Sequence, residues 1–238
     1  ETVIQFVGLI YGGIPERFSK LRIAFLEFGV GWIPYWMERM DEEWEKMLLR
    51  AAVHVTAARA QRILYRECMN CAVSDTKQNV CHNSKTYTLV VDYCQNMEVP
   101  VFNKEQPGCS YYYSPVGVYT CGVVNHGHLN NDGTVGEHMH AHVYHKGTGK
   151  KGSNNVASLI MKTLRIMDII RDTEVGGELN IFFDNCSSQN KNSTVLKLMV
   201  WHGEMGYFKC VNFNFLIVGH TKNAADHLFN VLKLQYRK

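Results

Sequence analysis

The chain has 238 residues and a formal net charge of +3 at pH 7. With 46% hydrophobic and 20% charged residues, its composition is that of a globular protein, which excludes a fibrous or wholly disordered chain. No apolar run approaches the roughly 20 residues that span a bilayer, so we expect no membrane association. No basic segment precedes an apolar stretch near Glu1, so we also expect no secretory signal.

Cysteine content and charge distribution indicate the cellular compartment and the kind of partner. The eight cysteines could form disulfides, but free intracellular thiols are favoured in a chain of this size without a secretory signal. Residues 1–50 carry 6 basic and 8 acidic side chains, whereas the remainder carries 19 basic and 14 acidic ones. This mildly basic larger part is compatible with a nucleic-acid partner. We therefore expect an intracellular protein, located in the nucleus if it acts on DNA. Nothing in the sequence indicates an oligomeric state.

The first third of the chain predicts a strand, a long helix and a polar loop. Residues 21–28 are apolar and predict a short strand, followed by a glycine turn at 29–31. From Pro34, apolar residues recur with a period near 3.6, which predicts a helix to about Cys68. Residues 69–85 are rich in polar side chains and predict a loop. A less favoured alternative is a zinc site, because four possible ligands lie here: Cys68, Cys71, Cys81 and His82.

The remainder alternates strands and helices and predicts an α/β fold. The expected elements are strands at 87–92 and 111–113, a hairpin of 116–128 and 137–145, a helix capped by Ser153 or Asn154, a strand at 179–184, a helix, a strand at 213–218, and a helix at 222–238. The two strands separated by a helix are typical of a parallel crossover. Each of them ends in a polar cluster that contains a carboxylate. Such strand ends line the ligand crevice of open α/β sheets.

Two polar stretches between these elements admit more than one interpretation. His138, His140 and His142 share one face of a strand and could bind a metal, although a solvated polar face is favoured because no fixed fourth ligand is evident. The loop at 146–152 is rich in Gly and Lys. It could contact phosphates through backbone N–H groups and lysines that include Lys150 and Lys151, or it could be a flexible exposed loop.

Residues 12–27 and 31–41 resemble part of the amidohydrolase family of metal-dependent barrels, in the branch of the aminocarboxymuconate-semialdehyde decarboxylase-like enzymes. The resemblance extends over one strand–helix unit of an eight-unit barrel, and one unit cannot close a barrel. No histidine precedes His54, so none of the metal ligands of that family has a counterpart here. We expect residues 1–48 to be an incomplete fragment of this kind.

The larger part of the chain resembles a transposase-like domain. Four motifs carry the resemblance: residues 91–97 (VDYCQNM), 151–158 (KGSNNVAS), 184–192 (DNCSSQNKN) and 219–226 (GHTKNAAD). They are similar to a domain of unknown function found in mobile-element-derived genes of eukaryotic microbes, and the similarity extends from about residue 52 to the end. The order of elements predicts an RNase H-like fold over 86–238, a mixed sheet flanked by helices. Residues 49–85 would link it to the strand–helix appendage as a long helix and a polar loop.

In the RNase H-like fold, the strand order 3-2-1-4-5 places the first and fourth strands side by side. Here these strands end in Asp92 and Asp184, and Asp226 follows the fifth strand. Three carboxylates in one crevice cannot all stay ionised without a cation, which predicts a Mg²⁺ or Mn²⁺ site that serves phosphodiester cleavage or strand transfer on DNA. His220 is a candidate general acid or base.

Other polar side chains of the same motifs are expected to contact nucleic acid or to support the carboxylates. With the two loop lysines already named, these are Asn185, Gln189, Asn190, Lys191, Lys222 and Asn223. Two alternatives remain. The domain could be an inactive nucleic-acid-binding relic of a transposase, or the protein could act through its N-terminal fragment as an amidohydrolase-like hydrolase or decarboxylase.

Overall fold

A computed structural model describes residues 8–9, 12–18, 20–21, 33–100, 108 and 111–236. The chain divides into two compact units, residues 1–53 and residues 54–238. In the first unit, the four-residue helix α2 spans Ile14–Arg17, and a second helix begins at Ile33. The predicted strand at 21–28 and the glycine turn lie outside the described residues, apart from Leu21.

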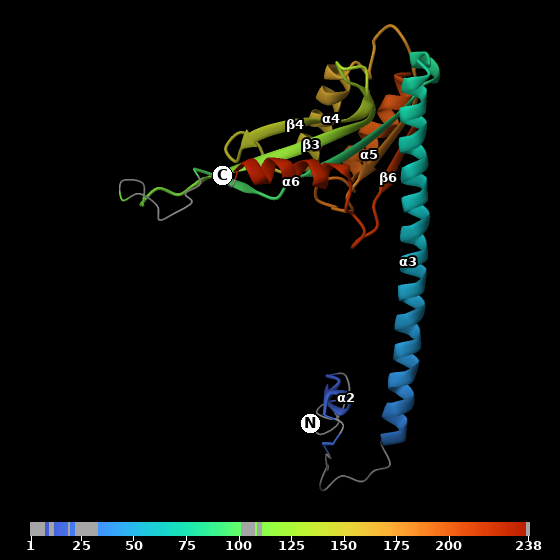
Figure 1. Cartoon of the computed structure of the whole chain (residues 1–238), viewed down its shortest axis with the longest axis vertical. Helices are drawn as coiled ribbons and strands as arrows, with labels where there is room; N and C mark the ends of the chain where they lie inside the picture. The colour runs from blue at the N-terminus through green and yellow to red at the C-terminus, as the bar shows by residue number, and fades with distance from the viewer. Residues whose placement is uncertain are drawn as a thin grey trace. The chain divides into compact units, whose positions relative to one another are not determined.

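Helix α3 spans Ile33–Lys77 and is longer than predicted (Figure 1). The predicted loop at 69–85 is therefore wrong over its first half, because burial extends the helix beyond Cys68. Ala72 is only 1% exposed, and its carbonyl oxygen lies 2.5 Å from the position that a Cβ at Gly127 would occupy. The helix thus packs directly on the backbone of a strand, which stabilises its last turns despite their polar composition.

Six strands form one mixed sheet. They are β1 (Thr86–Tyr93), β2 (Met97–Val99), β3 (Val116–Leu129), β4 (Val135–His145), β5 (Gly176–Phe183) and β6 (Phe208–Phe215). The order is β2-β3-β1-β5-β6, and β4 also pairs with β3. Strands β1, β5 and β6 are mutually parallel, whereas β3 is antiparallel to its neighbours β1, β2 and β4.

This topology confirms the predicted mixed α/β sheet preceded by a long helix. If the short strand β2 is left aside, the five long strands follow the order 3-2-1-4-5 that the sequence predicts. The β3–β4 hairpin, closed around residues 130–133, is also confirmed.

Three predicted details of the strands are wrong. Residues 111–113 form a turn and a bend instead of the predicted strand, and Tyr112 is 90% exposed. The three-residue strand β2 was missed because so short a segment carries no periodicity. Strand β6 ends at Phe215, whereas the sequence predicted a strand at 213–218.

The chain just beyond β6 is held by α3 instead of by a strand. The side-chain amide of Gln61 donates from Nε2 to the carbonyl oxygen of Phe215 at 2.6 Å and accepts at Oε1 from the N–H of Ile217 at 2.8 Å. On the opposite side, the N–H of Leu216 donates to the carbonyl of Phe183 in β5 at 2.8 Å. These bonds fix the start of the loop that leads to the last helix.

Helices cover both faces of the sheet (Figure 1). Helices α4 (Ser153–Ile166) and α5 (Ser193–Glu204) pack on one face through Val156, Ile160 and Met199, whereas α3 and α6 (Ala224–Tyr236) pack on the other through Tyr65 and Phe229. No helix among the described residues is long and apolar enough to cross a bilayer.

The helix termini differ from prediction at α4. Its N-cap is Gly152, without a side-chain cap, so the predicted cap by Ser153 or Asn154 is wrong. Helix α5 is capped by Asn192, whose side chain accepts from the N–H groups of Thr194 and Val195 at 3.1 Å.

Gly122 on β3, which has no side chain, sets how closely α6 approaches the sheet. A Cβ at Gly122 would lie 2.7 Å from Cζ of Phe229 and 2.9 Å from Sδ of Met139, distances that real contacts do not reach. The glycine therefore accommodates the Phe229 ring, which is 2% exposed. This contact seats the helix whose N-terminus contributes to the site described below.

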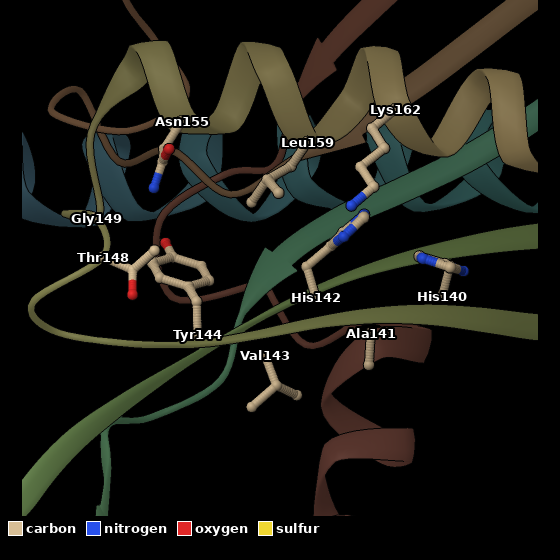
Figure 2. Close-up of a pocket in the computed structure, with 10 residues that line it drawn as sticks. All are labelled: His140, Ala141, His142, Val143, Tyr144, Thr148, Gly149, Asn155, Leu159 and Lys162. Atoms are coloured by element: carbon tan, nitrogen blue, oxygen red, sulfur yellow. The ribbon is translucent and has the colours of Figure 1, made fainter.

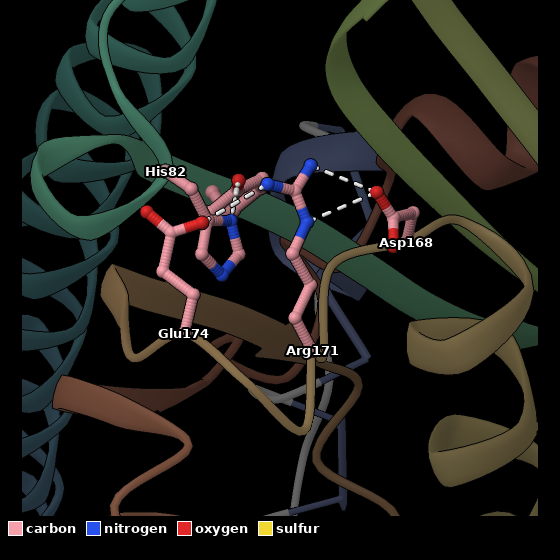
Figure 3. Close-up of polar contacts among 5 residues, drawn as sticks. His82, Asp168, Arg171 and Glu174 are labelled. Atoms are coloured by element: carbon pink, nitrogen blue, oxygen red, sulfur yellow. Dashed lines mark hydrogen bonds and ion pairs between the residues drawn. The ribbon is translucent and has the colours of Figure 1, made fainter.

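The loop after α4 is fixed by a cluster around Arg171 (Figure 3). Its guanidinium donates to Asp168 at 2.8 and 3.0 Å and to Glu174 at 3.2 Å. His82 lies beside this cluster and forms a hydrogen bond to the hydroxyl of Tyr87 through Nδ1 at 2.7 Å. Burial lowers the pKa of His82. The N–H of Glu178 in β5 donates to the carbonyl of Lys85 at 3.0 Å, which ties the segment before β1 to the start of β5. His82, one member of the predicted Cys/His set, is thus committed to packing.

Candidate functional site

Two carboxylates lie side by side where β1 and β5 end. In the parallel β1–β5 pair, Val91 is opposite Phe183, so the next residues along the two strands, Asp92 and Asp184, are neighbours. Both line an open cavity of about 500 Å³. Its other lining residues are Tyr93, Cys94, Gln95, Asn96, Lys151, Cys186 and Gln189. We call this cavity the carboxylate cleft.

The carboxyl group of Asp92 is partly buried at the cleft. Burial raises its pKa to about 6, and the nearby charges of Asp226 and Asp184 act in the same direction, whereas a hydrogen bond from Asn223 opposes them. That bond joins Asn223 Nδ2 to Asp92 Oδ2 at 3.2 Å, and Oδ1 accepts from the N–H of Tyr93 at 2.7 Å. A partly buried carboxyl group among like charges is stabilised by a proton or by a bound cation.

Asp184 is held by the loop that follows β5. Its Oδ1 accepts from the N–H of Cys186 at 2.9 Å and from Asn190 Nδ2 at 2.7 Å. Asn190 is 1% exposed and orients this carboxylate, which is the supporting role that the sequence analysis gave as one of two alternatives. Helix α5 is capped by Asn192, so Asp184 is not its cap.

Asp226 lies behind the cleft and completes the N-terminus of α6. Asn223 Oδ1 accepts from the N–H groups of Ala225 at 2.8 Å and Asp226 at 3.2 Å, while Asp226 Oδ2 accepts from the N–H of Asn223 at 3.2 Å. This reciprocal pair is a capping box. Asn223 therefore connects Asp226 to Asp92, and its side chain has the supporting role that the sequence analysis gave as one of two alternatives.

The donor set fits a magnesium ion held by two carboxylates. Across the part of the chain that the structure describes, no three His, Cys, Asp or Glu side chains are grouped closely enough to hold a metal. The predicted three-carboxylate cluster is thus not assembled, since Asp226 is committed to the cap. Mg²⁺, however, commonly takes one or two carboxylates and completes its shell with water and substrate oxygens. Asp92 and Asp184 meet that requirement.

Lys151 supplies positive charge to the cleft. Its Nζ donates to the carbonyl of Cys94 at 2.8 Å and lies 5.0 and 5.3 Å from the ring centres of Tyr93 and Tyr119. Burial lowers the pKa of Lys151. These contacts hold the ammonium group at the wall of the cleft, where a phosphate bound at the carboxylates would meet it.

The remaining predicted contact residues occupy different surroundings. Gln189 lines the cleft, and Asn185 is half-buried next to Asp184. Three lysines are exposed: Lys150, Lys191 and Lys222.

His220 is not part of the carboxylate cleft. It is exposed, and its ring centre lies 5.3 Å from that of His54 in α3. Its backbone carbonyl accepts from Arg62 Nη2 at 3.3 Å, and it lines a second cavity on α3. The predicted role of His220 as acid or base beside the carboxylates therefore finds no geometric support.

His142 of β4 points toward α4 (Figure 2). His142 is 8% exposed, and its Nε2 lies 2.6 Å from Oγ1 of Thr163. Burial, with the nearby His140 and Lys162, lowers the pKa of His142 to about 4. His138 is exposed and stacks on His128 at 4.4 Å between ring centres. The favoured prediction of a solvated face is wrong at His142, which is part of the packing against α4.

The comparisons with known proteins agree with an uncharacterised domain. No curated protein and no solved structure shows significant similarity to the chain. Residues 113–238 match the family described as "Domain of unknown function (DUF7869)". The match extends from the segment before β3 to the end of α6, includes Asp184 and Asp226, and begins downstream of Asp92. Because it takes in more than half of the chain, the protein belongs to the DUF7869 family.

Proposed function

We propose that the protein is a mobile-element-derived, RNase H-like nuclease domain that cleaves phosphodiester bonds of DNA with a divalent cation at Asp92 and Asp184. One observation carries the proposal. The two carboxylates project from the ends of adjacent parallel strands into one open cavity that also contains Lys151. The strand order and the transposase-like motifs support the same class of activity. A protein that cuts chromosomal DNA would have to reach the nucleus.

Each group of the cleft has a role in this function. Bound Mg²⁺ or Mn²⁺ would lower the pKa of a water molecule and neutralise charge on the scissile phosphate. Asp92 and Asp184 would hold the ion, and Asn190 keeps Asp184 oriented through its 2.7 Å hydrogen bond. Lys151 would attract the phosphate, and Gln189 would donate a hydrogen bond to it.

The decisive experiment is nicking of supercoiled plasmid by the full chain with Mg²⁺, with Mn²⁺ and with EDTA. We expect nicking that requires the metal and falls at least about hundredfold in Asp184→Asn, because this change removes a ligand charge with almost no change in shape. Asp172→Asn is the matched control, since its carboxylate is 72% exposed on a loop outside the cleft. Equal nicking by the wild type and Asp184→Asn would overturn the proposal.

A non-catalytic DNA-binding relic is the second candidate. The capping box favours it, because Asp226 is committed to α6 and leaves only two carboxylates facing the cleft. This candidate predicts salt-sensitive DNA binding by the wild type without cleavage in either metal. The amidohydrolase-like function is not proposed, since residues 1–53 contain no histidine for a metal site of that family.

A further inference from the structure

A second cavity, on the surface of α3, is lined by arginines that the proposed catalytic chemistry does not use. Its volume is about 550 Å³, and its lining residues are Val55, Ala58, Arg59, Arg62, Ile63, Arg66 and His220. We call Arg59, Arg62 and Arg66 the α3 arginine row. No Asp or Glu is among the residues that line this cavity.

The spacing of the row places its charges along one helix face. Positions three and seven residues apart fall on the same side of an α-helix, and seven residues extend about 10 Å along its axis. Arg59 and Arg66 are exposed and form no ion pair or hydrogen bond with the other described residues. Arg62 is half-buried and donates to the carbonyl of His220. Two of the three guanidinium groups are therefore available to an external anion.

The loop between β6 and α6 connects this cavity to the carboxylate cleft. At one end, the carbonyl of His220 accepts from Arg62, and at the other end Asn223 donates to Asp92. Three residues of chain cover at most about 11 Å. Lys222, between them, is exposed. A single anionic polymer could thus contact the arginine row, Lys222 and the cleft in succession.

We infer that the α3 arginine row binds the phosphate backbone of duplex DNA and directs it toward the carboxylate cleft. Guanidinium groups bind phosphates in bidentate fashion, and a row of about 10 Å spans about three phosphates at 3.4 Å of duplex axis per nucleotide of one strand. Besides the arginines and His220, the lining consists of the apolar side chains of Val55, Ala58 and Ile63. Contacts to the phosphate backbone carry no sequence information, so binding is independent of base sequence. This inference rests on the proposed function and names the surface that holds its substrate.

The test is binding of a fluorescent 30-base-pair duplex to the full chain in EDTA, at several salt concentrations. Arg59→Gln/Arg66→Gln removes the two available charges and leaves the Arg62 hydrogen bond intact. We expect about tenfold weaker binding and a log–log salt slope that is smaller by about two. Arg165→Gln/Lys197→Gln is the matched control, because it removes two exposed charges from α4 and α5, which cover the opposite face of the sheet. It should change binding little.

The possible outcomes separate this inference from the proposed nuclease function. If both double variants bind the duplex as the wild type does, the arginine row is overturned, while metal-dependent nicking still tests the nuclease. If the Arg59/Arg66 variant loses binding but the wild type nicks in neither Mg²⁺ nor Mn²⁺, the row is supported and the nuclease is overturned. If labelled poly-glutamate binds more tightly than the duplex and loses affinity in the same variant, the row binds an acidic protein segment instead, and the inference fails.

Discussion

The carboxylate cleft and the histidine-rich β3–β4 hairpin both bury titratable side chains, but the buried groups have opposite kinds of neighbours. In both regions, titratable side chains are withdrawn from water. His126 is 2% exposed, and burial lowers its pKa to about 4. Its Nε2 lies 2.9 Å from the hydroxyl of Tyr65, which is a neutral partner. Because the ring is neutral, its 3.3 Å approach to Glu137 is not an ion pair.

Asp92, by contrast, lies close to other acidic groups. Its neighbours include two further carboxylates, whose charges add to the effect of burial and raise its pKa to about 6. At His126 and His142, the hairpin therefore places neutral rings against hydroxyl groups, whereas the cleft gathers carboxylates around an open cavity. A region in which burial and like charges disfavour the ionised form of an acid is the better candidate for function.

The two regions should tilt the pH dependence of stability in opposite directions. Between about pH 4 and 6, folded Asp92 binds more protons than unfolded Asp92, so its contribution to stability falls as pH rises. For His126 and His142, the folded pKa of about 4 lies below the ordinary 6.5, so the folded state binds fewer protons. Their contribution rises with pH through the same window.

The largest stability effect should come from Asp92→Asn. A tenfold change in proton affinity corresponds to about 1.4 kcal/mol, so a pKa near 6 instead of 3.8 costs the ionised form at most about 3 kcal/mol. We expect the variant to be more stable than the wild type at pH 7 and little changed at pH 4, as measured by urea unfolding in EDTA. A stability difference that is equal at both pH values would contradict this explanation.

The packing of the hairpin on α4 should be weakened by Thr163→Val. This change keeps the shape of the side chain but removes the hydroxyl 2.6 Å from His142. Leaving the buried imidazole nitrogen without its partner should cost about 1–3 kcal/mol of unfolding free energy. Thr163→Ser keeps the hydroxyl and should restore most of that loss. If the serine variant is no more stable than the valine variant, the hydrogen bond is not the cause.

The smallest effect on stability is expected for Asn223→Ala, which tests how the Asn223 hydrogen bond affects the pKa of Asp92. Loss of the N-cap should cost about 1 kcal/mol. The same change removes the hydrogen bond that opposes the rise in the Asp92 pKa, so that pKa should move further upward. NMR titration of the Asp92 carboxyl carbon would measure it. A downward movement would show that Asn223 does not stabilise the ionised form.

The features that local sequence determines were predictable. The apolar runs before Asp92 and Asp184 identified two strands, and the turn residues at 130–133 identified the hairpin. The pairing of Asp92 with Asp184 followed from the strand order of the RNase H-like fold, which the order of elements predicted. The features that depend on tertiary packing were not predictable. Nothing local indicates that α3 continues to Lys77, since the burial of Ala72 against Gly127 stabilises that turn.

In the candidate site, too, local features were predictable and features that depend on tertiary packing were not. The sequence places Asp226 one turn into a helix but cannot show that its carboxylate bonds back to Asn223, which in turn bonds to Asp92. An Asn three residues before an Asp at a helix start was the available signal for this capping box. The burial of Asn190 and His142 carried no such signal, because it depends on contacts with distant segments.

The amide of Gln61 has a consequence for self-association. Strand β6 lies at one border of the sheet, where unpaired backbone groups can recruit a strand from another molecule. By accepting from Ile217 and donating to Phe215, the Gln61 side chain acts as the peptide group of a neighbouring strand would. One side chain of α3 thus occupies the backbone groups at the end of this border, and a second copy of the chain cannot extend the sheet there.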